Sequence, residues 1–147
     1  MIELHIMCGI QGSGKTTFAK ELSAKNNIIL YNYDIVAKTN WRPKLIYFIC
    51  EQIKQDLCAN KSVVYDDMNL IIKNRENLLS YFKNVNCKKI IHVMNTPLEI
   101  CLQRHHKRAA GYACLPDYYI ELCSKKYEPP TLDEGWDEII YHNYAEE

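Results

Sequence analysis

The sequence lacks several features that would place it in other classes of protein. Lysine and arginine together number 18, as do aspartate and glutamate, so there is no net charge to hold a long nucleic acid electrostatically. No apolar run approaches the roughly 18 residues of a transmembrane helix, and no charged leader or apolar signal segment opens the chain. We therefore expect a cytoplasmic protein without a membrane segment, which would have to bind any nucleic acid locally.

The seven cysteines include no CxxC pair, and several stand at apolar positions of expected strands and helices. This pattern is typical of buried thiols in a reducing compartment, so we expect neither disulfides nor a structural metal. The sequence also has no internal repeat, low-complexity tract or linker, and its 147 residues predict one domain spanning 1–147. Nothing in it indicates the oligomeric state.

The most informative segment is Gly9-Ile-Gln-Gly-Ser-Gly-Lys-Thr-Thr17, which directly follows an apolar run at residues 2–8. It matches the phosphate-binding pattern GxxxxGK[ST] between a strand and a helix, where glycines let successive backbone N–H groups converge on phosphate oxygens. Lys15 is expected to reach the β- and γ-phosphates, and the Thr16 hydroxyl to coordinate Mg²⁺. The residues expected to bind ATP are Gly9, Gln11, Gly12, Ser13, Gly14, Lys15, Thr16 and Thr17, together with Arg104.

Apolar runs that read as buried strands alternate with helical patterns along the chain. The spacing predicts strands at 2–8, 28–31, 62–65, 89–94 and 138–141, and helices at 15–26, 43–60, 73–83, 96–108 and 116–126. This alternation indicates an α/β fold of three layers, with a parallel sheet of about five strands, helices on both faces and ligands at the carboxyl ends of the strands. A helical lid containing a loop at 109–115 is expected over that edge, and 127–136 is expected to be irregular.

Acidic and amide residues follow two of the predicted strands. Asp34 stands after the second strand, where a carboxylate could take the proton of an attacking hydroxyl, or could instead cap the next segment. Asp66 and Asp67 follow the third strand, and because side chains alternate along an extended chain only one of them can point inward. We favour Asp67 as a ligand in the Mg²⁺ shell, and Asp67 and Asn69 as substrate-binding residues. The alternative is that these residues only form an Asx turn.

Basic residues gather on the predicted helix 96–108. Arg104 and Arg108 are four residues apart, hence on one face, and phosphate between them would offset their mutual repulsion; the alternative is a solvated basic helix end. His105 and His106 lack further ligands at suitable spacing and are expected to be exposed. Of the eleven tyrosines, Tyr33 and Tyr112 lie nearest the expected site, where a role in base stacking competes with one in the core.

These motifs together resemble the kinase module of polynucleotide 5′-hydroxyl kinases, over residues 2–142. The similarity lies in the phosphate-binding loop, Asp34, Asp67-Met68-Asn69, the Arg104 and Arg108 pair, and the segment Tyr127-Glu-Pro-Pro-Thr-Leu-Asp-Glu-Gly-Trp-Asp-Glu138. The resemblance implies that Asp34 activates the acceptor hydroxyl, that Asp67 and Asn69 support the site, and that Arg108 contacts the transferring phosphate. No companion phosphatase or ligase segment is present.

The chain departs from this family at one position. An arginine that commonly follows the family's aspartate by three residues, as an acceptor-phosphate contact, is replaced here by Ala37. Lys38 or Arg42 could substitute for it, so Lys38 is included among the substrate-binding candidates. The departure weakens the assignment of a polynucleotide acceptor more than that of phosphoryl transfer.

The leading hypothesis is an enzyme: an ATP- and Mg²⁺-dependent kinase of 5′-hydroxyl ends of DNA or RNA, with Lys15, Asp34 and Arg108 as catalytic residues. The rival is a kinase of the same fold acting on a small alcohol such as a nucleoside, an antibiotic or a nucleotide sugar. A third hypothesis is a nucleotide-dependent switch, which would be expected to carry DxxG and NKxD motifs. Neither motif occurs in the sequence.

Overall fold

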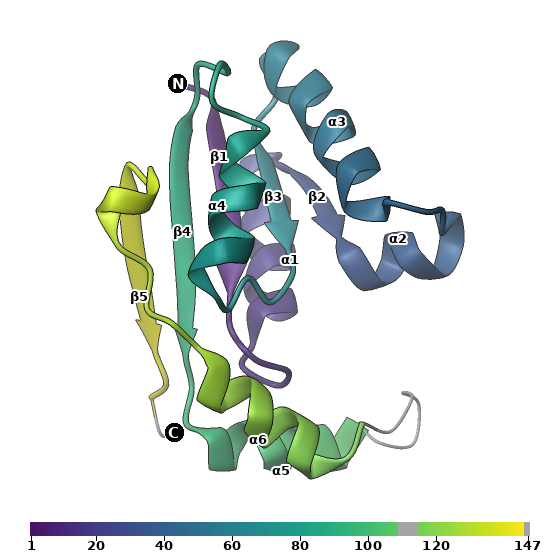
Figure 1. Cartoon of the computed structure of the whole chain (residues 1–147), viewed down its shortest axis with the longest axis vertical. Coiled ribbons are helices and arrows are strands. Elements are labelled where there is room, and N and C mark those ends of the chain that lie inside the picture. The colour runs from purple at the N-terminus through teal and green to yellow at the C-terminus, as the bar shows by residue number, and fades with distance from the viewer. Residues whose placement is uncertain (109–114, 146–147) are drawn as a thin grey trace.

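The computed structural model describes residues 1–108 and 115–145, and its centre is a sheet with the strand order β2-β3-β1-β4-β5 (Figure 1). All four neighbouring pairs of strands are parallel. The strands are β1 (Glu3–Cys8), β2 (Ile29–Asn32), β3 (Val63–Asp66), β4 (Lys88–Asn95) and β5 (Glu138–Asn143). The predicted α/β fold with about five parallel strands is therefore confirmed.

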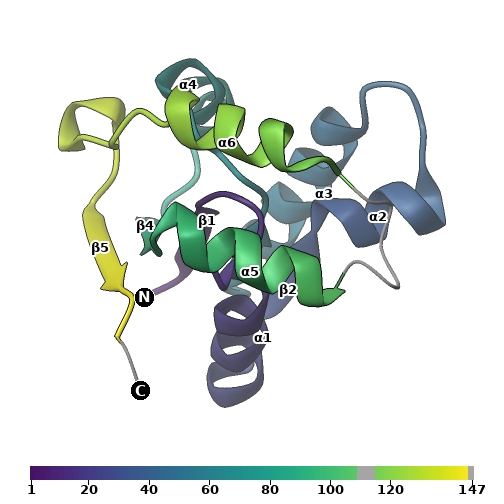
Figure 2. The same cartoon turned by 90° about the horizontal axis from the view of Figure 1, so that it is seen from below.

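Helices cover both faces of the sheet, which makes the three predicted layers. Helix α1 (Lys15–Asn26) lies on one face, and α3 (Leu45–Cys58) and α4 (Ile72–Ser80) lie on the other (Figure 1). Helices α5 (Leu98–Arg108) and α6 (Asp117–Lys126) cross the carboxyl ends of the strands, as the view from below shows (Figure 2). The remaining elements are α2 (Tyr33–Asn40) and the 3₁₀ turn η1 (Leu132–Glu134).

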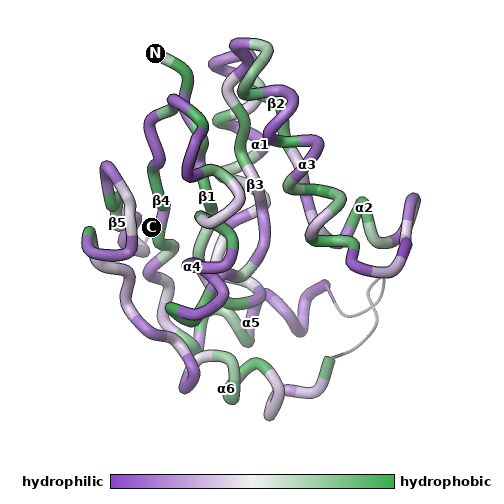
Figure 3. Tube along the Cα trace, turned by 45° about the horizontal axis from the view of Figure 1, so that its top comes forward, coloured by the Kyte–Doolittle hydropathy of each residue, from purple (hydrophilic) through white to green (hydrophobic). Residues whose placement is uncertain are grey.

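The core follows from the alternation of side chains along the strands. On β1, Leu4 and Ile6 face the α3 and α4 layer, while Met7 packs with Ala19 of α1 on the opposite face. Because both faces are covered, β1 is hydrophobic over most of its length (Figure 3). No helix in the described ranges is long and apolar enough to cross a bilayer.

Helix α2 is the element that the sequence patterns missed. The side chain of Asn32 accepts a hydrogen bond of 3.0 Å from the backbone N–H of Ile35, so Asn32 is the residue that caps this helix. Asp34 lies in the first turn of α2, which removes the alternative interpretation of Asp34 as a cap. Asn32 was the available signal, but the eight-residue helix is too short to show a clear apolar period.

One of the expectations about burial needs correction. His105 was expected to be exposed, but it is buried where α6 packs on α5, and its Nε2 lies 2.8 Å from the Leu115 carbonyl oxygen. His106 is exposed beside Asp117, as expected. Cys58 is exposed, whereas Cys114 lies outside the described residues. The other five cysteines are buried and free: Cys8, Cys50, Cys87, Cys101 and Cys123.

Three histidines form a hydrogen-bonded ladder across β1, β4 and β5 on the face that α1 covers. His5 Nδ1 lies 2.8 Å from His92 Nε2, and His92 Nδ1 lies 2.9 Å from His142 Nε2. Glu3 Oε1 lies 3.2 Å from His5 Nε2. Burial lowers the pKa values of all three histidines and so favours neutral rings. Because an ionised carboxylate only accepts hydrogen bonds, neutral rings form one consistent chain in which His5 donates to Glu3, His92 donates to His5, and His142 donates to His92.

This ladder predicts that the protein loses stability in mild acid. Burial lowers the pKa of His92 from 6.5 to about 3, and burial also lowers the pKa values of His5 and His142. The unfolded chain therefore binds more protons below about pH 6.5, and the stabilisation that is full above that pH is lost as the pH falls. We expect His92 alone to cost roughly 2 kcal/mol of unfolding free energy between pH 7 and pH 5.

Urea unfolding of the wild type and His92→Gln at both pH values measures this cost. In His92→Gln, the slope of unfolding free energy against pH should be smaller by the contribution of about one proton. Gln103→Ala changes an exposed residue and removes no ionisable group, so it should keep the slope of the wild type. Equal slopes for His92→Gln and the wild type would contradict the prediction.

Candidate functional site

The phosphate-binding loop connects β1 to α1 at the centre of the sheet. Gly12 and Gly14 have φ values of 80° and 98°, a conformation that residues with a Cβ rarely adopt. A Cβ on Gly12 would also lie 2.6 Å from the Cys101 carbonyl oxygen, whereas one on Gly14 would meet nothing closer than 3.6 Å. Gly12 is thus required by both its backbone conformation and its packing, whereas Gly14 is required by its backbone conformation alone, since a Cβ there would make only ordinary contacts with Arg104 and Met94.

Neighbouring elements hold this loop in place. Thr96 Oγ1 donates to the Ser13 carbonyl oxygen at 2.8 Å, and Arg104 Nη1 donates to the Gly12 carbonyl oxygen at 3.0 Å. The Ser13 hydroxyl and the Gln11 Oε1 atom are buried without a hydrogen-bond partner in the described structure. A phosphate in the loop would supply a partner for the Ser13 hydroxyl, so the loop fits the nucleotide that its sequence predicts.

Lys15 lies where the ends of three strands converge. Burial lowers the pKa of Lys15, and the carboxylates of Asp66, Asp67 and Asp34 oppose that shift, so all three act on this amine. Its Nζ atom donates to the Ile10 carbonyl oxygen at 3.1 Å. The charges at the carboxyl ends of β2 and β3 therefore act on the lysine of the loop that follows β1.

The carboxylate beside Thr16 is Asp66, not the predicted Asp67. Thr16 Oγ1 donates to Asp66 Oδ2 at 2.7 Å, and Asn32 Nδ2 donates to the same oxygen at 2.6 Å. Asp67 instead accepts hydrogen bonds from the Tyr65 hydroxyl and the Met68 backbone N–H. Asp66 is the last residue of β3, and its side chain points toward Thr16. Side chains alternate between the two faces of a strand, and the sequence alone did not show which of the two aspartates would point this way.

Asn69 holds the backbone of the segment after β3. The extended chain assumed for Asp67 and Asn69 ends before Asn69, whose φ is 49°. Its Nδ2 donates to the Met7 carbonyl oxygen at 2.8 Å, and the nearby Gly9 N–H donates to the Met68 carbonyl oxygen at 3.0 Å. These two bonds fix the segment 67–70 against β1 and the phosphate-binding loop.

Arg75 supports the same segment from α4, and sequence reasoning missed it. The guanidinium is fully buried, pairs with Glu134 at 2.7 Å and 3.1 Å, and donates to the carbonyl oxygens of Asn69 and Leu70. Burial raises the pKa of Glu134, but hydrogen bonds from Arg75 and Trp136 lower it by more. The segment 127–138 therefore acts in part by carrying the counter-ion of Arg75. The acidic η1 turn was the available signal, but its partner is 59 residues away in sequence.

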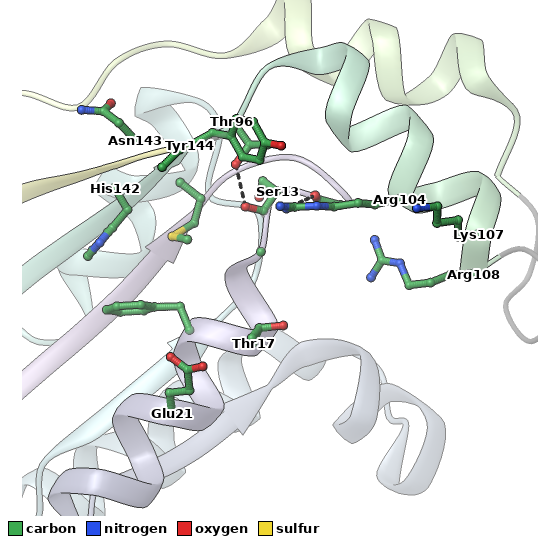
Figure 4. A pocket seen from close by; sticks show the side chains of 15 residues that line it. Ser13, Thr17, Glu21, Thr96, Arg104, Lys107, Arg108, His142, Asn143 and Tyr144 are labelled. Carbon is green, nitrogen blue, oxygen red and sulfur yellow. Dashed lines mark hydrogen bonds between the residues drawn. The ribbon is translucent and has the colours of Figure 1, made fainter. Parts of the chain in front are cut away.

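A cavity of about 1040 Å³ opens beside the phosphate-binding loop on the β4 and β5 side (Figure 4). The guanidinium groups of Arg104 and Arg108 both reach it from α5, one turn apart as predicted. The His142 end of the histidine ladder lies on its opposite wall. Its lining residues include Gly12, Ser13, Gly14, Thr17, Phe18, Thr96, Arg104, Arg108, His142 and Tyr144.

A second cavity, of about 490 Å³, lies on the β2 and β3 side of the loop. Tyr33, Asp67 and Asn69 line it together with residues of α4, so these three predicted residues share one cavity. Lys38 is exposed on α2 and does not line this cavity, and Arg42 lies over the Phe48 ring at 3.7 Å. The predicted loop 109–115 is described only at Leu115, and Tyr112 lies outside the described residues.

Comparison with known proteins identifies the family of this chain. The model of the AAA domain family AAA_33 matches residues 4–130. The chain belongs to this family. An L-seryl-tRNA(Sec) kinase of Methanococcus maripaludis is 27% identical over 146 residues, which cover 91% of this chain and 56% of that protein. This AAA domain thus spans a little over half the length of that relative.

Solved kinase structures share the fold of this AAA domain at low sequence identity. A fungal RNA kinase superposes with a TM-score of 0.75 at 16% identity, covering 99% of this chain and 76% of that one. A sugar kinase of Janibacter sp. HTCC2649 superposes with a TM-score of 0.73 at 15% identity, covering 97% and 86%. The arrangement is therefore that of a P-loop kinase fold, and it is shared by proteins named for different acceptors.

Proposed function

We propose that this protein is an ATP-dependent kinase that transfers the γ-phosphate to the 5′-hydroxyl end of a nucleic acid. The observation that carries the proposal is a pair of cavities: one is lined by the phosphate-binding loop, and the other by the segment 67–70, which is hydrogen-bonded to the loop and β1. One cavity offers two arginines to a polyphosphate, and the other offers amides, hydroxyls and the Asp67 carboxylate to an acceptor. In-line transfer needs donor and acceptor on opposite sides of the moving phosphoryl group.

On the donor side, this chain's residues bind and orient the triphosphate. The loop's N–H groups and Lys15 would hold the phosphates, while Arg108 would stabilise charge on the phosphoryl group in transfer. Thr16 and Asp66 offer the hydroxyl and carboxylate oxygens that Mg²⁺ prefers, and their 2.7 Å contact fits a shared role. When bound there, Mg²⁺ would neutralise charge developing between the β- and γ-phosphates.

On the acceptor side, Asp34 is the proposed general base. It is exposed in the first turn of α2, directly after Tyr33, which lines the acceptor cavity, and its charge acts on both Lys15 and Asp67. A carboxylate there can accept the proton that the acceptor hydroxyl loses during transfer. Asp67 and Asn69 form the wall beside it.

A small-alcohol acceptor is the second candidate, favoured by one position. Ala37 replaces the arginine expected to contact an acceptor phosphate, and the acceptor cavity contains no lysine or arginine among its described lining residues. The shared fold of the sugar kinase is compatible with this candidate. The resemblance in the segment 127–138 and the fungal RNA kinase fold support the nucleic-acid acceptor.

Transfer of labelled γ-phosphate to 5′-hydroxyl oligonucleotides, nucleosides and sugars distinguishes these acceptors. Asp34→Asn is expected to lower kcat about 10²- to 10⁴-fold on the preferred acceptor with little loss of ATP affinity, because only proton acceptance is removed. Lys15→Ala is the inactive reference, and Lys20→Ala on the exposed side of α1 is the matched control. Label on sugars but on no oligonucleotide would overturn the proposed acceptor, and a collapse of ATP binding in Asp34→Asn would make Asp34 a structural or metal-binding residue.

A further inference from the structure

One wall of the acceptor cavity is a row of amide side chains on α4. Asn74, Asn77 and Tyr81 follow a spacing of three and four residues, so they lie on one side of α4 and its C-terminal cap, and all three line the cavity. Both asparagines are exposed, and neither side-chain amide is hydrogen-bonded within the described residues. An amide carries two donors and an acceptor, so this wall offers unused hydrogen-bonding groups.

Aromatic rings supply further parts of the cavity lining. Tyr81 is held in place by Tyr47, whose ring meets it edge-on with centroids 5.6 Å apart. Tyr33 enters from the end of β2 and is partly buried against the main core. Both tyrosines are therefore fixed by packing while part of each ring lines the cavity. A planar ring stacking on either tyrosine would bury apolar surface at a small cost in side-chain entropy.

The charges of the cavity disfavour an anionic occupant. No lysine or arginine is among its described lining residues, and its one ionisable acid is Asp67. A phosphate or a sugar acid placed here would meet a carboxylate and no counter-ion. An anionic occupant is therefore disfavoured, and the amides suit an occupant that presents both hydrogen-bond donors and acceptors.

Resting on the kinase function proposed above, we propose that this cavity binds the 5′-terminal nucleobase of the acceptor. The base would stack on Tyr33 or Tyr81, and Asn74 and Asn77 would hydrogen-bond its edge. A nucleobase is planar, so it can stack on the tyrosine rings, and its edge carries the donors and acceptors that the amides can bind. It is also uncharged, which suits a cavity whose described lining contains no lysine or arginine. A neutral sugar would use the amides but would leave the tyrosine faces without a stacking partner.

The test compares two 5′-hydroxyl trinucleotides that differ only in the terminal nucleoside, one normal and one abasic. Both keep the reacting hydroxyl and the backbone, so both should be phosphorylated, but the abasic acceptor should have a KM about 5- to 150-fold higher, the range that base–aromatic stacking contributes. Equal KM values would overturn the base-binding site while leaving the proposed kinase intact. Phosphorylation of sugars and of neither trinucleotide would overturn the proposed function itself.

Variants on α4 test the amide wall separately. In Asn74→Ala/Asn77→Ala, the preference for the normal over the abasic trinucleotide should fall at least about threefold, and calorimetric titration without ATP should show the same loss in affinity for the normal trinucleotide. Glu76→Ala is the matched control, since Glu76 is exposed on α4 and does not line the cavity. A double variant that keeps the wild-type preference would overturn recognition by these amides.

Discussion

Asp66→Asn is expected to lower phosphoryl transfer by about 10²- to 10³-fold and to raise the Mg²⁺ concentration needed for half-maximal rate. The variant keeps the shape of the side chain and a hydrogen-bond acceptor for Thr16 and Asn32, but it removes the charge beside the Thr16 hydroxyl. The measurement is a Mg²⁺ titration of the initial rate at saturating ATP, together with a thermal melt that checks folding.

The neighbouring residue provides the matched control. Asp67→Asn alters a carboxylate that lines the acceptor cavity and bonds Tyr65, so it is expected to change the acceptor KM and to leave the Mg²⁺ requirement unchanged. The opposite pattern, with Asp67→Asn shifting the Mg²⁺ titration and Asp66→Asn leaving it unmoved, would restore the assignment made from the sequence. Both variants are well suited to one experiment because they remove the same charge one residue apart.

Arg75→Ala is expected to lower the free energy of unfolding by about 3–5 kcal/mol, because it leaves the Glu134 carboxylate buried without its counter-ion. It also removes the donor to the carbonyl oxygens of Asn69 and Leu70, so the segment that carries Asp67 loses its support. Urea unfolding followed by circular dichroism measures the loss.

Two further variants separate the ion pair from a general weakening of α4. Lys73→Ala changes an exposed residue of the same helix and should shift stability by no more than about 0.5 kcal/mol. Arg75→Met/Glu134→Leu removes both charges and should recover much of the loss. A decrease below about 1 kcal/mol in Arg75→Ala would show that Glu134 is solvated and that the pair contributes little.

The sequence predicted best where the signal is local. The phosphate-binding loop carries its own backbone requirements in its glycines, and apolar runs of strand length located all five strands within a residue or two. The i, i+4 spacing of Arg104 and Arg108 predicted that they share one helix face, and both line the larger cavity. Helix α2 was missed because a short helix offers only its Asn32 cap as a signal.

The features that sequence reasoning missed depend on partners distant in the chain. The choice between Asp66 and Asp67 depends on which side of β3 faces Thr16. Thr16 lies 50 residues before Asp66 in the sequence. His105 is buried only because α6 packs on α5, and Arg75 finds its counter-ion 59 residues away. None of these relations has a spacing rule, because each follows from how the elements pack.

The sequence by itself determined the phosphate-binding loop, the α/β alternation and the set of polar residues at the strand ends, since backbone conformation and hydrophobic period are local properties. Only the tertiary structure decided which carboxylate meets Thr16, which arginine supports the segment 67–70, and how the amides of α4 and two tyrosines come to line one cavity. Those outcomes depend on strand order and helix packing, which bring together side chains from segments that share no local pattern.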